Sequence, residues 1–200
     1  MPGLYILSDP NTGLLKIGRA SNLESRLSSL RTANPDLVVE AWIETDQESK
    51  LESVLHTLFT SSRRRGEFFA VDPEMAINKA NAVLETLNSI PTDQELDEIN
   101  QINDLQSHRT ATADEIAYLE ELFRVRAAKK ELEIEEQLLV GKLKRSIGHH
   151  EGLTDFATFK RLSRQAFDQT AFQEDHPDLF QEYQRESYSR PFKARPYLRN

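Results

Sequence analysis

The sequence contains no cysteine, which excludes disulfide bonds and thiolate-bound metals and is typical of a reducing compartment. It also contains no run of the ~18 apolar residues that a transmembrane helix needs. Its first residues lack the basic and apolar stretches of a secretory signal. We therefore expect a cytoplasmic protein with no membrane partner.

Basic residues are outnumbered, because 25 Lys and Arg stand against 33 Asp and Glu, which gives a net charge of −8. The acidic excess is uneven: residues 91–140 hold 13 acidic and 5 basic residues, whereas residues 141–200 hold 8 and 11. Contacts to phosphate are local. The overall acidity therefore does not exclude a nucleic acid as a partner.

The first ninety residues have the pattern of a small α+β domain with a mixed sheet. Turn residues in SDPNTG join two short apolar runs, which indicates a β-hairpin, and Ser21 or Asn22 is a good N-cap for the following helix. The predicted elements are a hairpin (3–7 and 14–18), a helix (from 22), a strand (36–44), a helix (from about 46), a basic loop leading into a short strand (63–71) and a helix (73–88). We assign residues 1–90 to this domain.

The remainder of the chain predicts a linker and a helical module. Residues 91–110 are polar and acidic and are expected to form a partly helical linker. In residues 111–200, early acidic and late basic residues surround apolar residues spaced three or four apart, which predicts one long helix that ends near Gly148. Beyond it we expect a strand (154–162), a helix broken near Pro177 and an extended piece (190–196), together a small α/β module.

Four ordered pieces of the first domain carry a resemblance to a known family. They read GLYIL, LLKIGRASNLESRLSSL, ESKLESVLHTLF and RRRGEFF, and they extend over residues 3–75. In this order, and with the predicted strands and helices around them, they resemble the GIY-YIG nuclease superfamily, in particular the phage and bacterial T5orf172-like branch whose second signature reads KIG.

This resemblance implies a metal-dependent endonuclease of phage or mobile-element type, which hydrolyses DNA phosphodiesters with one Mg²⁺ or Mn²⁺ ion. Carried over to this sequence, Tyr5 is the first signature tyrosine and Lys16 takes the place of the second. Arg26 is the arginine of the first helix, and Glu52 is the carboxylate that holds the metal. His56 lies one turn beyond Glu52 and completes the implied catalytic set, although a half-buried helix histidine would explain it equally well.

The chemistry of these side chains suits phosphodiester hydrolysis. Mg²⁺ accepts a single protein carboxylate and keeps several waters, so Glu52 alone can hold it. Arg26 offers a planar fork for phosphate oxygens. Tyrosine is a poor base at neutral pH, and Lys16 on the neighbouring strand would stabilise its phenolate. We therefore predict that Tyr5 is the general base and that Lys16 tunes it.

Other polar residues leave alternatives open. Glu48 competes with Glu52 for the metal because the two lie one turn apart on a helix, and Glu67 has no role that the sequence defines. Arg19 and the run Arg63, Arg64 and Arg65 are candidates for phosphate contacts, although a solvated loop would explain the run equally well.

The end of the chain is similar to the accessory tail of YqaJ-type phage exonucleases, in LKRSIGHHEGL, TFKRLSRQAFD, HPDLFQEY and SRPFKAR. Lys160, Arg161 and Arg164 alternate with Phe159 and Phe167, a composition that could contact a nucleic-acid backbone. The alternative is a small aromatic core with solvated bases.

We thus expect an endonuclease whose C-terminal module binds DNA or a partner. The alternatives are a nuclease-like fold that binds DNA or protein without cutting, and a protein whose long helix serves interaction alone. The same helix leaves self-association open.

Overall fold

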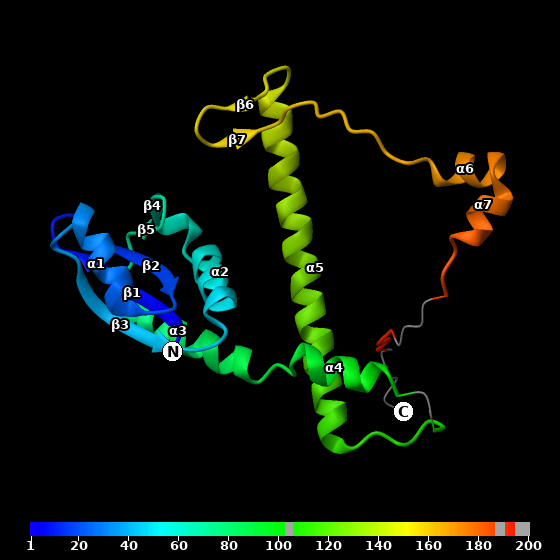
Figure 1. The fold of residues 1–200 in the computed structure, drawn as a ribbon, viewed down its shortest axis with the longest axis horizontal. Coiled ribbons are helices and arrows are strands. Elements are labelled where there is room, and N and C mark those ends of the chain that lie inside the picture. Colours follow the sequence, from blue (N-terminus) through cyan, green and yellow to red (C-terminus); the bar gives the residue numbers. More distant parts are fainter. Residues whose placement is uncertain (103–105, 187–190, 195–200) are drawn as a thin grey trace. The chain divides into compact units, whose positions relative to one another are not determined.

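Figure 1 shows the computed structural model of the chain, which describes residues 1–102, 106–186 and 191–194. The chain divides into two compact units, the first unit Met1–Ile99 and the second unit Asn100–Asn200. The predicted α+β class is confirmed, since helices and a β-sheet both occur but do not alternate around a parallel sheet.

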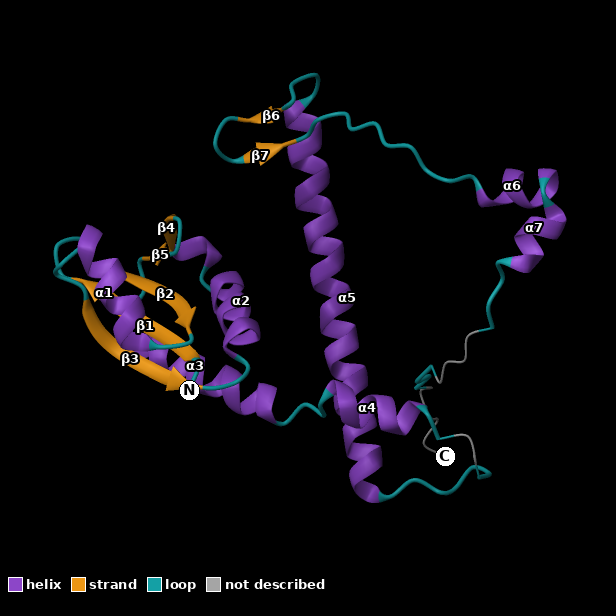
Figure 2. Cartoon of the chain, viewed as in Figure 1, coloured by secondary structure: helices purple, strands orange, loops and turns teal. Residues whose placement is uncertain are grey.

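A five-stranded sheet forms the centre of the first unit (Figure 2). Its strands lie in the order β3-β1-β2-β5-β4, and every neighbouring pair is antiparallel. The strands are β1 (Gly3–Asp9), β2 (Leu14–Ala20), β3 (Val38–Glu44), β4 (Arg63–Arg65) and β5 (Phe68–Phe69). The predicted hairpin is confirmed as β1 and β2, whose turn places Gly13 at φ +67°.

Three helices cover the two faces of this sheet: α1 (Leu23–Ala33), α2 (Glu48–Leu58) and α3 (Pro73–Asn88). Side chains alternate along β1, so that Leu4 and Ile6 pack with α2 and α3 while Tyr5 and Leu7 pack with α1. Because the pleat gives each strand two faces, both faces of this short strand are buried.

The start of α1 follows the predicted cap. The Asn22 side chain accepts a hydrogen bond of 2.9 Å from the backbone N–H of Ser25, which satisfies one of the free N–H groups of the first turn. The helix then packs its leucines against Tyr5 and Leu7 of β1.

The arginine run differs from the prediction. Arg63–Arg65 is not a loop but strand β4, which pairs with β5 through a tight turn at Gly66. Gly66 has φ +56°, a conformation that glycine adopts without the penalty a Cβ brings. The sequence signal for a loop was the charge of the run, and the turn residue that makes the hairpin lies just after it.

The second unit is dominated by one helix, α5 (Ala113–Ile147). Thr112 forms a capping box with Glu115, and Gly148 ends the helix at φ +57°, as predicted. The predicted linker contains α4 (Asp93–Asn100), a helix of eight residues.

The rest of the second unit is small. The expected strand of residues 154–162 is reduced to the hairpin β6 (Gly152–Leu153) and β7 (Ala157–Thr158), whereas the expected broken helix is confirmed as α6 (Gln169–Asp175) and α7 (Pro177–Glu182). Most of the extended piece predicted for residues 190–196 lies outside the described residues. No described helix is both long and apolar enough to cross a membrane.

Candidate active site

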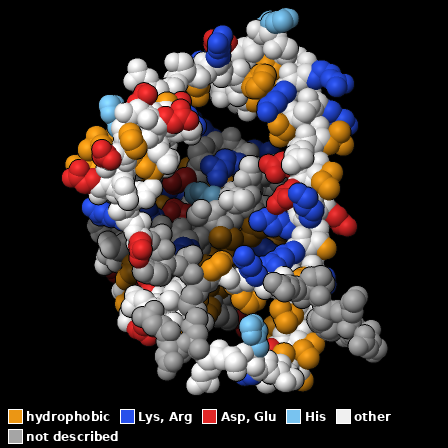
Figure 3. Space-filling view, turned by 90° about the vertical axis from the view of Figure 1, so that its right-hand side faces the viewer, with side chains coloured by type: hydrophobic (Ala, Val, Ile, Leu, Met, Phe, Trp, Pro, Cys, Tyr) orange, Lys and Arg blue, Asp and Glu red, His pale blue; other side chains and the backbone are white. Residues whose placement is uncertain are grey.

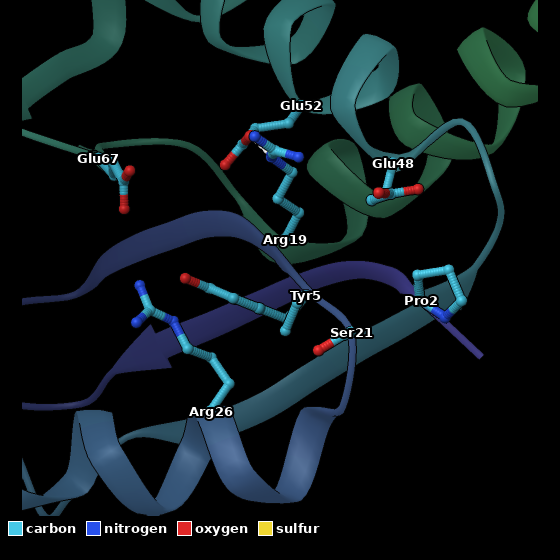
Figure 4. A pocket seen from close by; sticks show the side chains of 9 residues that line it. Pro2, Tyr5, Arg19, Ser21, Arg26, Glu48, Glu52 and Glu67 are labelled. Carbon is cyan, nitrogen blue, oxygen red and sulfur yellow. Dashed lines mark hydrogen bonds and ion pairs between the residues drawn. The ribbon is translucent and has the colours of Figure 1, made fainter.

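A pocket of about 490 Å³ opens beside the C-terminal end of β2 (Figure 4). Its position follows from the short length of β5, which pairs only with Leu15 and Lys16 of β2. The second half of β2 therefore has a strand on one side only, and side chains from both helical layers reach around the open side. The lining residues are Pro2, Tyr5, Arg19, Ala20, Ser21, Arg26, Glu48, Glu52 and Glu67.

Tyr5 places its hydroxyl in this pocket while its ring is buried. The residue is only 1% exposed, and Figure 4 shows the hydroxyl directed toward the Arg26 side chain from α1. The hydrogen bond between Arg26 and the Tyr5 hydroxyl, followed by the charge interaction of the two groups, raises the pKa of the Arg26 guanidinium. The phenol hydroxyl therefore contacts the Arg26 guanidinium.

Gly18 makes room for this ring. It lies directly opposite Tyr5 in the β1–β2 ladder, and a Cβ at this position would lie 2.3 Å from the Tyr5 hydroxyl oxygen and 2.5 Å from Cζ. Only glycine allows the ring to lie across the neighbouring strand. The sequence motifs alone gave Gly18 no role, although a glycine inside a strand is a signal for such a close approach.

Lys16 lies on the same face of the sheet as Tyr5, but its ammonium is bound elsewhere. It is directly opposite Leu7 in the ladder, and its Nζ donates to Glu67 Oε2 at 2.5 Å. The hydrogen bond from Lys16 is the main cause that lowers the pKa of the Glu67 carboxyl. The structure thus gives Glu67 a partner, and it places Arg26 rather than Lys16 on the Tyr5 hydroxyl.

Two carboxylates from α2 form the opposite wall. Glu52 Oε2 accepts a hydrogen bond of 3.0 Å from Arg19 Nε, which makes an ion pair across the pocket (Figure 4). Glu48 lies one turn earlier on α2, and its Oε2 is buried with no hydrogen-bond partner among the described residues. Both of the carboxylates that the sequence left as alternatives therefore line the same pocket.

His56 lies outside the lining of the pocket. Its Nε2 is 2.9 Å from the carbonyl oxygen of Ile17, and because a carbonyl only accepts, this nitrogen donates. Its ring lies 5.1 Å from the ring of Phe69. These contacts tie α2 to β2 at the point where β5 ends, so the geometry gives His56 a positioning place rather than contact with the reacting atoms.

The residues assigned to nucleic-acid contacts fall into two groups. In the first unit Arg19 lines the pocket, and Arg63 is exposed on β4, where it donates to Gly66 O at 3.1 Å and lies 5.0 Å from the centre of the Phe69 ring. Arg64 and Arg65 are exposed on β4.

The second group belongs to the second unit. Lys160 pairs with Glu151 at 3.6 Å, whereas Arg161 and Arg164 are exposed in an irregular segment. Phe159 and Phe167 are 43% and 71% exposed. These two phenylalanines therefore do not form the buried aromatic core that was the alternative for this region.

The carboxylates can be tested against the metal that the resemblance implies. No cluster of three or more His, Cys, Asp or Glu side chains suited to a metal occurs in the part of the chain that the structure describes. Mg²⁺ usually takes one or two protein carboxylates and keeps several waters, however, and an unpartnered buried oxygen of Glu48 lies one turn from Glu52. The donor set fits a hard, water-rich divalent cation.

The fold and this pocket together define an α+β domain whose polar site is lined by arginine and glutamate side chains. Residues 3–90 match the family model of the T5orf172 domain, a family associated with GIY-YIG and HNH-like nucleases. The match covers less than half of the 200 residues. The chain matches no curated protein and no solved structure, and nothing in these comparisons supports the similarity of the C-terminal part to YqaJ-type exonucleases.

Proposed function

We propose that the first unit hydrolyses DNA phosphodiesters with the help of a divalent metal ion. The observation that carries this proposal is that Tyr5, Arg26 and Glu52, which come from a strand and two separate helices, line one pocket. A phenol, a guanidinium and a carboxylate are the groups needed to accept a proton, to bind a phosphate and to hold a hard cation.

Tyr5 is the proposed general base. Its phenolate oxygen would accept a proton from the attacking water. Arg26, which hydrogen-bonds to this oxygen, would place a positive charge beside it. We therefore transfer the tuning role predicted for Lys16 to Arg26, and Lys16 becomes the residue that positions Glu67 at the edge of the pocket.

Glu52, with Glu48 beside it, would hold the metal. A bound Mg²⁺ or Mn²⁺ would act as a Lewis acid on phosphate oxygens and add positive charge where negative charge develops. In the structure, Arg19 forms an ion pair with Glu52. In the proposed reaction, the Arg19 guanidinium would leave Glu52 and bind a phosphate oxygen of the substrate instead, because arginine pairs with phosphate as well as with carboxylate.

A second pocket extends the site along the start of α1. It shares Arg19, Ser21 and Arg26 with the first pocket and is also lined by Ser25 and Ser29. Hydroxyl groups and arginines are common partners of the sugar-phosphate backbone. This surface supports a path for the strand on one side of the cleaved bond.

One observation favours a second candidate function, which is DNA or protein binding without cleavage. The ion pair between Arg19 and Glu52 neutralises the carboxylate that the metal would need. If that pair persists when Mg²⁺ is present, the pocket binds phosphate but performs no hydrolysis.

The test uses supercoiled plasmid and the full chain, with Mg²⁺ and with chelator. We expect nicking that requires Mg²⁺, and a loss of roughly 100-fold or more in Glu52→Gln and in Tyr5→Phe. Glu85→Gln, an exposed carboxylate on α3, is the matched control and should retain full activity. Retained DNA binding without nicking by the unmodified chain would support the second candidate and refute the first.

A further inference from the structure

The apolar residues of α5 form a regular exposed row. Tyr118, Val125, Leu132 and Leu139 follow one another at intervals of seven residues, and they are 73%, 49%, 65% and 52% exposed. Figure 3 likewise shows hydrophobic side chains at the surface among Lys, Arg, Asp and Glu side chains. Monomeric proteins rarely leave a large apolar surface uncovered.

A second set of positions completes the row into a heptad repeat. This second set lies three or four residues from members of the row and consists of Leu122, Lys129, Glu136 and Leu143. Two of its four residues, Lys129 and Glu136, are charged. We call these eight residues the α5 seam. It spans 26 residues, or about 38 Å of helix at ~1.5 Å per residue. Sustained apolar residues at such spacing are the pattern of a two-stranded coiled coil.

We propose that the α5 seam pairs with the seam of a second copy of this chain in an antiparallel coiled coil. This inference is independent of the proposed nuclease function. A helix of 35 residues draws most of its stability from packing of its apolar face, and a second copy supplies a face of matching length and spacing.

The two charged seam residues decide the direction. In a parallel pair in register, Lys129 would meet Lys129 and Glu136 would meet Glu136 at the centre of the interface, which is unfavourable. In an antiparallel pair, Lys129 lies opposite Leu132 of the second copy and Glu136 lies opposite Val125. Like charges are separated, and Leu122 meets Leu139 in the same register.

The charges beside the seam are complementary in this register. Arg126 of one copy lies next to Glu133 of the other, and Glu121 lies next to Lys142, and each of these pairs occurs twice because of the two-fold symmetry. Within one chain, Glu121 pairs with Arg124, and Glu133 pairs with both Lys129 and Lys130. These are exposed pairs within one helix, which are weak and can exchange for pairs between the copies.

The first test measures the molar mass of the full chain by analytical ultracentrifugation over a range of micromolar concentrations. We expect a dimer, and we expect Leu132→Asp to be a monomer. Ile134→Asp is the matched control, because Ile134 is also exposed, at 57%, but lies off the seam. A monomeric unmodified chain, or equal effects of the two variants, would overturn the proposal.

A charge exchange tests the register without placing a charge in the seam. Arg126→Glu alone and Glu133→Arg alone should each weaken dimerisation by roughly tenfold, because two attractive pairs become repulsive. The double variant Arg126→Glu/Glu133→Arg should restore the affinity. Failure of the double variant to recover would refute the antiparallel register.

The direction of the helices can be read from disulfides, since the chain has no cysteine of its own. Mixed Leu122→Cys and Leu139→Cys chains should form the mixed disulfide on oxidation. In a parallel pair, the two chains that carry Leu139→Cys would instead form a symmetric disulfide with each other. In the antiparallel register the two copies of position 139 lie about 25 Å apart along the helix axis. Predominance of that symmetric disulfide would overturn the proposal.

Discussion

Among single residues, Gly18 decides the position of the Tyr5 ring, because it has no side chain in the space that the ring occupies. The ring lies across the neighbouring strand, which leaves the hydroxyl at the pocket and next to Arg26. The signature KIG thus carries two different physical requirements. Lys16 orients a carboxylate, and Gly18 admits a ring.

Gly18→Ala should therefore damage the site more than it damages the fold. We expect a loss of cleavage comparable to that of Tyr5→Phe, and a destabilisation of about 1–3 kcal/mol from overpacking. Unfolding can be followed through the fluorescence of Trp42, the one tryptophan, which packs near Tyr5. The control is Gly141→Ala on α5, where a Cβ would meet no atom within 4 Å. Full cleavage by Gly18→Ala would contradict the close packing.

The ion pair of Lys16 and Glu67 predicts a pH dependence of stability. Because the hydrogen bond from Lys16 lowers the pKa of Glu67 below its ordinary value of 4.5, the folded state binds fewer protons at this site than the unfolded chain. The stabilisation is complete above about pH 4.5 and is lost as the pH falls through the lower pKa of the folded state. The difference in unfolding free energy between the unmodified chain and Glu67→Gln should shrink over that range, and a difference that stays constant to pH 2 would show that the pair is not formed.

Among the secondary-structure elements, helix α2 contributes both to the core and to the pocket. Leu51 and Leu55 are buried on one side of it, and Glu48 and Glu52 reach the pocket from another. The sequence predicts this division because a helix that repeats every 3.6 residues presents an apolar and a polar side at once. Helical spacing likewise located α1, whereas apolar runs joined by turn residues located β1 and β2.

Other features could not be predicted from local pattern. The strand β4 is exposed and made of arginines, so it has neither the alternation nor the apolar content of a strand. The partners of Arg26 and Lys16 depend on contacts with Tyr5 and Glu67, which lie 21 and 51 positions away in the chain, and spacing in the sequence carries no information on them. The pocket itself exists because β5 is short, a property of the fold rather than of any motif.

The anchoring of α2 gives a prediction for the element. Leu55→Ala should destabilise the first unit by roughly 2–5 kcal/mol, the usual cost of removing a buried leucine side chain. Leu58→Ala on the same helix removes a side chain that is 47% exposed and should cost less than about 1 kcal/mol. Urea unfolding monitored by Trp42 fluorescence measures both, and equal effects would contradict the observed orientation of α2.

For the whole molecule, the net charge of −8 does not show that positive charge is concentrated in particular segments. Exposed arginines lie on β4 in the first unit, and another exposed group lies between β7 and α6 in the second. The two units are separate compact bodies, so each group can contribute to DNA binding by itself.

The salt dependence of binding separates the two contributions. If Arg64 and Arg65 contact phosphates, Arg64→Ala/Arg65→Ala should weaken binding to duplexes of any sequence, and the slope of log K against log salt should fall by up to about 2. Arg161→Ala/Arg164→Ala in the second unit is the matched comparison. A slope that neither double variant changes would rule out both groups as phosphate contacts.

The brevity of β5 has one more consequence. Past Ile17, the outer rim of β2 has no described strand beside it, and such rims accept foreign extended chains through backbone hydrogen bonds. A peptide that adds to this edge as an extra strand would cover the pocket. Because it binds through its backbone, its own side chains would matter little. Such a peptide would inhibit the protein by binding the unpaired edge of β2, and it would not compete with phosphate for the arginines of the pocket.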